Sequence, residues 1–428
     1  MTHIPGAVAV TAASVLSPLA DDLDGFTAAL LAGRSAVTLP SPEDSADDSA
    51  GGEACLPVAA LDGFTLADWA ARHLPDEPAT AAQLRKVAGR AALPARTAAC
   101  VALRAVRDSG LGAGELADGT ALLVAGSNLA LAHQAETVLG HDRAPGRLRA
   151  SYALTHLDAD VIGVVSELTG IQGEGWALGG ASASGTLALV HGARTVAAGW
   201  AERVLVVAPA AELSPVEAEA FRRTGALAHE NLRGEPARMC RPFDRDRQGF
   251  VRGQAAAAVL LERPEAARAR GAEVLAEIVG HGQRLDARRG TEPDAGGQAA
   301  AMRAALATAG LTPEDIDYVN AHGTGSVLGD ETEAASLHQV FGARTDLRVN
   351  STKPLTGHCL SAAGLVEAVA TIAQLRAQAV HPNPNLEHPV AELALAGRTA
   401  ERRPLRTALS NSFAFGGINA SVVIRVQP

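Results

Sequence analysis

An internal repeat is the feature of this sequence that most restricts its fold, because two similar halves must fold alike. In each half, a helical pattern ends in a short glycine- or proline-containing stretch and leads into an apolar run, ALLVAGS in the first and YVNAHGTGS in the second. A glycine-rich turn also opens a helix in each half, GGASASGTLALVHG and GHCLSAAGLVEAVA. We expect a boundary near residues 264–275, with Ser182 and His358 at corresponding helix starts that meet across a pseudo-twofold axis.

Short apolar runs alternate with helical patterns along the whole chain. Such runs occur near residues 8, 120, 203 and 255, and this alternation indicates an α/β protein with buried strands. Aromatic residues make up only 3% of the chain, so the core must be filled mainly by Ala, Val and Leu. The segment Ser41–Glu53 is rich in Ser, Asp, Glu and Gly, and we expect it to be an exposed loop.

Composition excludes several classes of protein. The four cysteines show neither CxxC pairing nor metal-ligand spacing with histidine, so we expect reduced thiols and no metal site. A net charge of -10 disfavours nucleic acid as a partner, because phosphate binding requires a concentrated basic surface. We see neither a run approaching the roughly 18 apolar residues that cross a bilayer nor a secretory signal, so no membrane association and a cytoplasmic location are expected.

Two motifs hold candidate catalytic side chains. At GGASASG, an apolar stretch is followed by two glycines and then by a helical pattern. Ser182 would therefore be presented on a sharp strand-to-helix turn, beside backbone N–H groups. In NAHGTGS, His322 lies between a strand end and a glycine-rich loop, where α/β folds place ligand-binding groups. Taken singly, small residues before a helix are more often a packing feature, and a loop histidine is as compatible with an ordinary structural role.

Two further motifs follow in the second half. The stretch NSTKPLTGHCLSAAG contains Lys353 and His358, and NSFAFGGINAS contains Phe415, Gly416 and Gly417. Glycines beside Phe415 would let a loop tip move and let its backbone approach a ligand. Four motifs in this order make coincidence improbable.

These motifs, together with RPFDRDRQGFVRG (Arg241–Gly253), resemble the signature of the β-ketoacyl-acyl-carrier-protein synthases of the thiolase superfamily. The resemblance covers nearly the whole chain. It implies an α/β thiolase fold of five αβαβα layers built from two duplicated halves, which we place at residues 1–264 and 265–428. It also implies a homodimer, and a structural role without chemistry for the segment around Asp244.

The resemblance implies roles for individual residues. His322 and His358 match the two family histidines, Phe415 matches the gating phenylalanine, and Ser182 stands where the family has its nucleophilic cysteine. Backbone N–H groups of Ser182 and Phe415 would line the oxyanion hole, and Lys353 is expected to pair with Glu333 and hold the histidine loop. The substrate and pantetheine contacts fall on Thr324, Ser326, Gly416 and Gly417. No cofactor is implied beyond the phosphopantetheine arm of a carrier protein.

The serine changes the expected chemistry. A serine hydroxyl is a poor nucleophile without an adjacent base, so acyl transfer onto Ser182 should be very slow. Two imidazole N–H groups would still stabilise the enolate that forms when a malonyl thioester loses carbon dioxide, and protonation would then give an acetyl thioester. The stretches GEGWALGGASASG and ELSPVEAEAFRRTGA (Glu212–Ala226) resemble serine-containing ketosynthase-like decarboxylases of polyketide β-branching cassettes, which supply acetyl-carrier protein to a hydroxymethylglutaryl-synthase-like partner.

Rival functions remain open at this point. One is a non-catalytic partner resembling a chain-length factor, although such proteins typically lose the histidines as well. Another is a serine-dependent acyltransferase, or a condensing enzyme whose cysteine was replaced in the laboratory. Because carrier proteins are acidic, an acidic enzyme must recruit one through local positive charge. The candidates for that charge are Arg85, Lys86, Arg90, Arg222 and Arg223.

Overall fold

The computed structural model describes residues 6–39, 56–228 and 235–427. The expected loop Ser41–Glu53 lies outside these residues. One sheet of ten strands runs in the order β10-β9-β13-β14-β8-β1-β7-β5-β3-β4. The strands of the first half are β1 (Val8–Leu16), β3 (Thr120–Ala125), β4 (Gly175–Leu178), β5 (Arg203–Ala208) and β7 (Ala256–Glu262). Those of the second are β8 (Ala276–Leu285), β9 (Tyr318–Asn320), β10 (Arg348–Asn350), β13 (Thr407–Ala414) and β14 (Ile418–Arg425).

The strand order is symmetric about the contact between β1 and β8. Moving outward from this contact, each half repeats the same pattern: two antiparallel pairings followed by two parallel pairings. The two central strands themselves pair antiparallel over Val8–Val10. Two duplicated halves, as expected from the repeat, therefore build the molecule. The division at residue 264 stays a prediction.

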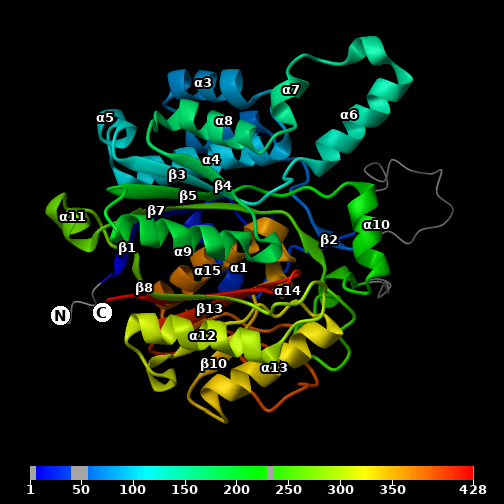
Figure 1. The fold of residues 1–428 in the computed structure, drawn as a ribbon, viewed down its shortest axis with the longest axis vertical. Coiled ribbons are helices and arrows are strands. Elements are labelled where there is room, and N and C mark those ends of the chain that lie inside the picture. The colour runs from blue at the N-terminus through cyan, green and yellow to red at the C-terminus, as the bar shows by residue number, and fades with distance from the viewer. Residues whose placement is uncertain (1–5, 40–55, 229–234, 428) are drawn as a thin grey trace.

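The strands of the first half and those of the second half form two separate layers, with helices between them and on both outer sides. The molecule therefore has five layers, α–β–α–β–α (Figure 1). One outer layer contains α2 (Leu66–His73), α3 (Pro78–Ala88), α4 (Leu93–Ser109) and α8 (Ala159–Thr169). The central layer contains α1 (Leu23–Leu31), α9 (Ser184–Ala197) and α15 (Ala363–Ala377). The other outer layer contains α12 (Ala295–Ala309) and α13 (Val327–Phe341). As the low aromatic content predicts, the buried clusters between these layers consist largely of Ala, Val and Leu.

Helices α9 and α15 contact each other at the centre of the molecule through a pair of glycines. A β-carbon on Gly185 would overlap the backbone of Leu365, and one on Gly364 would overlap Thr186. Only glycine allows the two helices to approach so closely. The helix starts that lead to the candidate site are therefore held at a fixed distance from each other.

The structure corrects how the two helix starts correspond. Each helix is preceded by one turn of 3-10 helix, Ala181–Ala183 before α9 and Leu360–Ala362 before α15. The first residue of each turn has a positive φ, 47° at Ala181 and 52° at Leu360. Ser182 therefore corresponds to Ser361. His358 lies three residues before the position expected for it, and it reaches the site from the loop that leads into the turn.

One apolar stretch was not anticipated. Residues Leu360–Ala377 have a mean hydropathy of 1.2 and are long enough to span a bilayer by length and composition alone. This stretch is 83% buried, because it is the central helix α15 with its preceding turn, covered by sheet on both sides. It is a core helix of the fold.

Candidate active site

Ser182 occupies the sharp strand-to-helix turn that the sequence predicts. Strand β4 ends at Leu178, and two glycines lead into the turn before α9. A β-carbon on Gly179 would overlap Ser127, and one on Gly180 would overlap Leu187, so neither position accepts another residue without rearrangement. Together with the positive φ of Ala181, this tight path presents the half-buried Ser182 side chain at the start of the helix.

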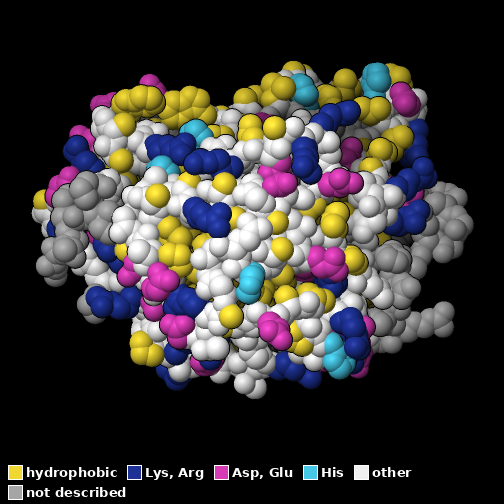
Figure 2. Space-filling model, turned by 60° about the horizontal axis from the view of Figure 1, so that its bottom comes forward, with side chains coloured by type: hydrophobic (Ala, Val, Ile, Leu, Met, Phe, Trp, Pro, Cys, Tyr) yellow, Lys and Arg dark blue, Asp and Glu magenta, His cyan; other side chains and the backbone are white. Residues whose placement is uncertain are grey.

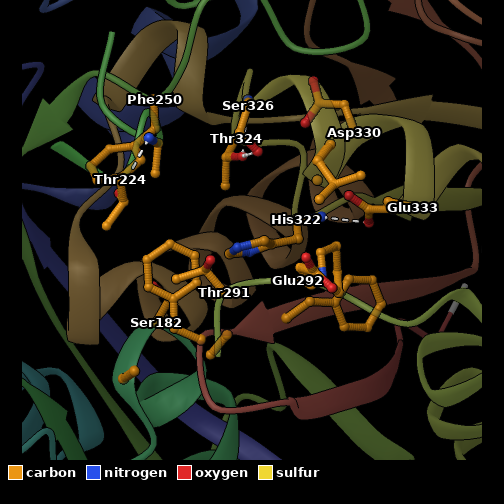
Figure 3. Close-up of a pocket in the computed structure, with 18 of the residues that line it drawn as sticks. Ser182, Thr224, Phe250, Thr291, Glu292, His322, Thr324, Ser326, Asp330 and Glu333 are labelled. Atoms are coloured by element: carbon orange, nitrogen blue, oxygen red, sulfur yellow. Dashed lines mark hydrogen bonds between the residues drawn. The ribbon is translucent and has the colours of Figure 1, made fainter. Parts of the chain in front are cut away.

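Ser182 borders a cavity of about 270 Å3 that brings together residues from both halves (Figure 3). Among the predicted site residues, the lining includes Ser182, His322, Thr324, Ser326, Glu333, His358 and Phe415. Gly416 and Gly417 lie beside the cavity in the turn between β13 and β14, with φ values of 85° and 70°. Lys353 is fully buried behind the lining.

The two histidines and the serine form a compact group. The rings of His322 and His358 are perpendicular, with centroids 5.5 Å apart. Ser182 Oγ lies 3.0 Å from His358 Nε2. Both rings are almost completely buried, yet both border the cavity. The group could therefore contact one small substrate from two directions.

Hydrogen-bond partners indicate which ring nitrogen carries the proton. The backbone N–H of Leu360 donates to His358 Nδ1 over 3.3 Å, and the Lys353 ammonium lies 3.4 Å from His322 Nδ1. Because both Nδ1 atoms accept, each Nε2 must carry the hydrogen of a neutral ring. Burial, followed by the charge of Lys353, holds the pKa of both histidines well below 6.5. Two neutral N–H donors result.

The proton positions also decide what Ser182 can do. His358 Nε2–H donates to Ser182 Oγ, so His358 cannot take the hydroxyl proton in this state. Nucleophilic serines require a neighbouring base with a free lone pair. Ser182 is thus placed as an acceptor of a hydrogen bond rather than as an activated nucleophile.

Comparison with known proteins identifies the family. The β-ketoacyl synthase N-terminal domain matches residues 6–267, and the C-terminal domain of the same enzymes matches residues 275–387. The chain belongs to the β-ketoacyl synthase family. It is 32% identical to the polyketide biosynthesis malonyl-ACP decarboxylase PksF of Bacillus subtilis, over 98% of this chain and 96% of that protein. It is also 32% identical to 3-oxoacyl-[acyl-carrier-protein] synthase 2 of Vibrio cholerae, over 98% of both chains.

Solved structures agree with the thiolase fold of these ketosynthases. The ishigamide ketosynthase/chain length factor superposes with a TM-score of 0.85 at 26% identity, covering 99% of both chains. A β-ketoacyl synthase from Burkholderia phymatum superposes with a TM-score of 0.84 at 29% identity, over 98% of this chain and 99% of the other. The fold expected from the sequence motifs is confirmed.

Within this ketosynthase fold, Lys353 has a different partner from the one predicted. Its ammonium forms a buried ion pair with Glu367 Oε1 at 2.5 Å and donates to the carbonyl oxygen of His322. Glu367 belongs to α15, and burial raises the pKa of its carboxyl. Glu333 instead accepts hydrogen bonds from the backbone N–H groups of His322 and Gly323 at 2.8 and 2.7 Å. The prediction of a Lys353–Glu333 pair is therefore wrong.

Glu333 nevertheless holds the histidine loop, as expected, but through the backbone. Its carboxyl joins the first turns of α13 to the loop that follows β9. Burial raises the pKa of Glu333 to about 7, although the two N–H donors oppose this increase. The His322 loop is thus fixed on one side by Lys353 and on the other by Glu333.

Aromatic residues that the sequence analysis did not single out connect the ketosynthase histidines with the cavity mouth. The Phe250 ring meets His358 edge-on at 5.1 Å, Phe221 meets Phe250 edge-on at 5.7 Å, and Phe415 stacks on Phe221 at 6.0 Å. Phe221 and Phe250 lie inside motifs that were quoted, yet no spacing rule distinguishes them from core residues. For Glu367 a signal existed, since it is the single acidic residue in the apolar helix α15.

The basic residues expected to recruit a carrier protein separate into two groups. Arg222 and Arg223 lie on α10 (Pro215–Arg223), next to the cavity-lining Phe221. The residues of the other group lie on or just after α3, far from α10 (Figure 1). On the face seen in Figure 2, basic side chains are interspersed with acidic ones and form no continuous basic surface. Of these two groups, the α10 group is the one next to a cavity-lining residue, Phe221.

Proposed function

We propose that this ketosynthase-family enzyme decarboxylates malonyl-S-ACP to acetyl-S-ACP in polyketide β-branching. The observation that carries the proposal is the combination of two neutral imidazole donors with a serine that accepts from one of them. Malonyl decarboxylation requires donors and no nucleophile. The full-length likeness to a polyketide malonyl-ACP decarboxylase supports the same reaction.

The proposed step conserves atoms and charge. The bond between the malonyl carboxylate and the α-carbon breaks, carbon dioxide leaves, and the electron pair enters the thioester enolate. The Nε2–H groups of His322 and His358 then donate to the thioester oxygen, where negative charge develops. The α-carbon takes a proton from water, since no acyl-enzyme is present to react with the enolate. Acetyl thioester is the product.

The remaining predicted site residues take supporting roles in this proposal. The Ser182 hydroxyl accepts from His358 when no substrate is bound. Once the thioester oxygen takes this Nε2–H, the hydroxyl orders the substrate or a water molecule. Thr324 and Ser326, with the loop containing Gly416 and Gly417, contact the pantetheine arm, and Phe415 gates the entrance. Backbone N–H groups of Ser182 and Phe415 form a second donor pair. No cofactor is needed beyond the phosphopantetheine arm of an acyl carrier protein.

We further propose that the enzyme works as a cytoplasmic homodimer. Its acetyl-carrier product would serve an enzyme resembling hydroxymethylglutaryl synthase. The names of both full-length relatives refer to thioesters of acyl carrier protein, which supports a carrier protein as the partner here.

Intact-mass spectrometry after incubation with malonyl-carrier protein tests the proposal. We expect the carrier to lose the mass of one carbon dioxide while the enzyme mass stays unchanged. An acyl adduct that accumulates on Ser182 would favour the serine acyltransferase instead. If the carrier remains malonylated although the enzyme is folded, the result would favour the non-catalytic partner that resembles a chain-length factor.

A further inference from the structure

The segment Arg241–Gly253, expected to be only a structural loop, contacts both histidine-bearing segments. The backbone N–H of His358 donates to Val251 O over 2.7 Å, and Gly253 N–H donates to His358 O over 2.9 Å. Further along, Gly249 N–H donates to Gly325 O over 2.9 Å. One segment from the first half thus supports the two loops of the second half that reach the cavity.

The Arg247 side chain joins this segment to the turn 324–327 through backbone carbonyls of the turn. Only 3% of the side chain is exposed. Its guanidinium donates to Val327 O at 2.7 Å and to Ser326 O at 3.3 Å. It also donates to Asp244 O at 3.0 Å and forms an ion pair with Glu331 at 2.8 Å. A planar group with five donors suits such a set of acceptors, whereas a single ammonium cannot reach all of them.

A buried carboxyl complements this guanidinium. Asp330 is 1% exposed, and its Oδ2 lies 3.9 Å from Arg247 Nε. The same carboxyl accepts from Gly325 N–H at 3.1 Å and from Phe243 N–H at 2.7 Å. Buried charges are costly unless they are paired and hydrogen-bonded, and here both conditions hold. Arg247 therefore holds the turn through its carbonyl groups, and Asp330 holds it through a backbone N–H group.

The turn held in this way contributes cavity-lining hydroxyl groups. Thr324, Ser326 and Val327 all border the cavity. Thr324 Oγ1 donates to Ser326 Oγ at 2.9 Å and accepts from Ser326 N–H at 3.2 Å, so the two hydroxyls orient each other. Within the turn, the carbonyls that Arg247 binds belong to Ser326 and Val327. Arg247 thereby fixes the peptide planes on which the Ser326 hydroxyl depends.

We propose that Arg247 is a positioning residue that holds the turn 324–327 in the geometry required to bind the phosphopantetheine arm of a carrier-bound substrate. This inference rests on the proposed function for the nature of the substrate. It does not depend on what happens to the acyl group once the arm is bound.

The test compares wild type with Arg247→Lys. Binding of an acyl carrier protein is measured in two forms, with the phosphopantetheine arm and without it. We expect wild type to bind the armed form more tightly, and we expect Arg247→Lys to lose this difference while binding the armless form as before. With malonyl-carrier protein, KM should rise by roughly 10- to 100-fold, as for lost charge-assisted hydrogen bonds, and kcat should change less.

Arg344→Lys is the matched control. Arg344 is also largely buried, donates to Ile316 O at 3.0 Å and pairs with Asp346 at 2.8 Å, but it does not border the cavity. We expect it to leave both the binding difference and KM unchanged. A folded Arg247→Lys enzyme that keeps the wild-type difference and the wild-type KM would overturn the inference.

Glu331→Ala covers the case in which Arg247→Lys does not fold. Glu331 is 59% exposed, and its loss removes one of the contacts that hold the guanidinium. We expect KM to rise in the same direction by roughly two- to fivefold, as for one ordinary hydrogen bond, and an unchanged KM would contradict the inference. Because the binding comparison needs no turnover, a wild type that prefers the armed carrier but releases no carbon dioxide would contradict the proposed function alone.

Discussion

At the scale of single residues, the candidate site is defined by which atoms carry protons. The Leu360 N–H donates to Nδ1 of His358, and the Lys353 ammonium donates to Nδ1 of His322. Each neutral ring therefore carries its hydrogen on Nε2. The sequence could place His322, His358 and Ser182 in one site through the motifs alone. It could not assign the tautomers, because these depend on a lysine and on a backbone group brought close only by folding.

Ser182→Cys tests the position of the nucleophile turn. A thiol at the start of α9 would gain stabilisation of its thiolate from the backbone N–H groups, so we expect thioester acylation and iodoacetamide labelling at residue 182. Labelling followed by peptide mass mapping measures this. The buried Cys240 serves as an internal control, because burial raises the pKa of its thiol to about 12. A variant cysteine as unreactive as Cys240 would show that the turn does not activate a thiol.

His358 should make stability depend on pH with a known sign. Its folded-state pKa lies well below 6.5, so below pH 6.5 the unfolded chain takes up a proton that the folded chain does not. The stability from this group is complete above pH 6.5 and is lost as the pH falls. Between pH 7 and 5.5, wild type should lose about 1 kcal/mol more unfolding free energy than His358→Gln. Denaturant titration at each pH measures this, and parallel losses would contradict the assigned shift.

At the scale of elements, the repeat predicted the fold better than it predicted the register. From the repeat, Ser182 and His358 were expected at corresponding helix starts, whereas the positive φ values pair Ser182 with Ser361. The backbone conformation of Ala181 and Leu360 has no signature in their side chains. Similarly, the partner of Lys353 lies on α15, and only the packing of that helix against the histidine loop selects Glu367 over Glu333.

The Lys353–Glu367 pair should couple stability to the position of His322. Removing one member leaves an unpaired buried charge, so Lys353→Met and Glu367→Gln should each reduce the unfolding free energy by roughly 3–5 kcal/mol and also lower the decarboxylation rate. The double variant should be less destabilised than the sum of the two single variants. Thermal unfolding and initial rates measure both effects. Single variants with wild-type stability would contradict the ion pair.

At the scale of the whole molecule, one end of the sheet lacks a cover. Strand β4 is an edge strand on which Trp176 is 40% exposed. Helix α6 (Leu131–Arg143) projects from the body of the molecule (Figure 1). It has no buried residue and carries two apolar side chains, Val138 and Leu139, that are each 55% exposed. A helix with such side chains and an unpaired strand edge are both stabilised by a partner surface.

We therefore predict that a second copy of the chain covers this end. Light scattering coupled to size exclusion should give twice the chain mass of 43.6 kDa. Trp176→Glu places a charge on the edge strand and should shift the protein toward the monomer. Val216→Glu, at a 73% exposed site on α10, is the control and should stay dimeric. A monomeric wild type would contradict the prediction.

The central claim is that the two imidazole donors, rather than the serine hydroxyl, carry the reaction. Initial rates of carbon dioxide release from malonyl-carrier protein should be measured for the folded variants His322→Ala, His358→Ala and Ser182→Ala. Each histidine variant loses a donor to the developing enolate oxygen, so its rate should fall roughly 10²- to 10³-fold. Ser182→Ala keeps its backbone N–H and frees the His358 donor, so its rate should fall by about tenfold at most. A Ser182→Ala enzyme slower than both histidine variants would contradict the account.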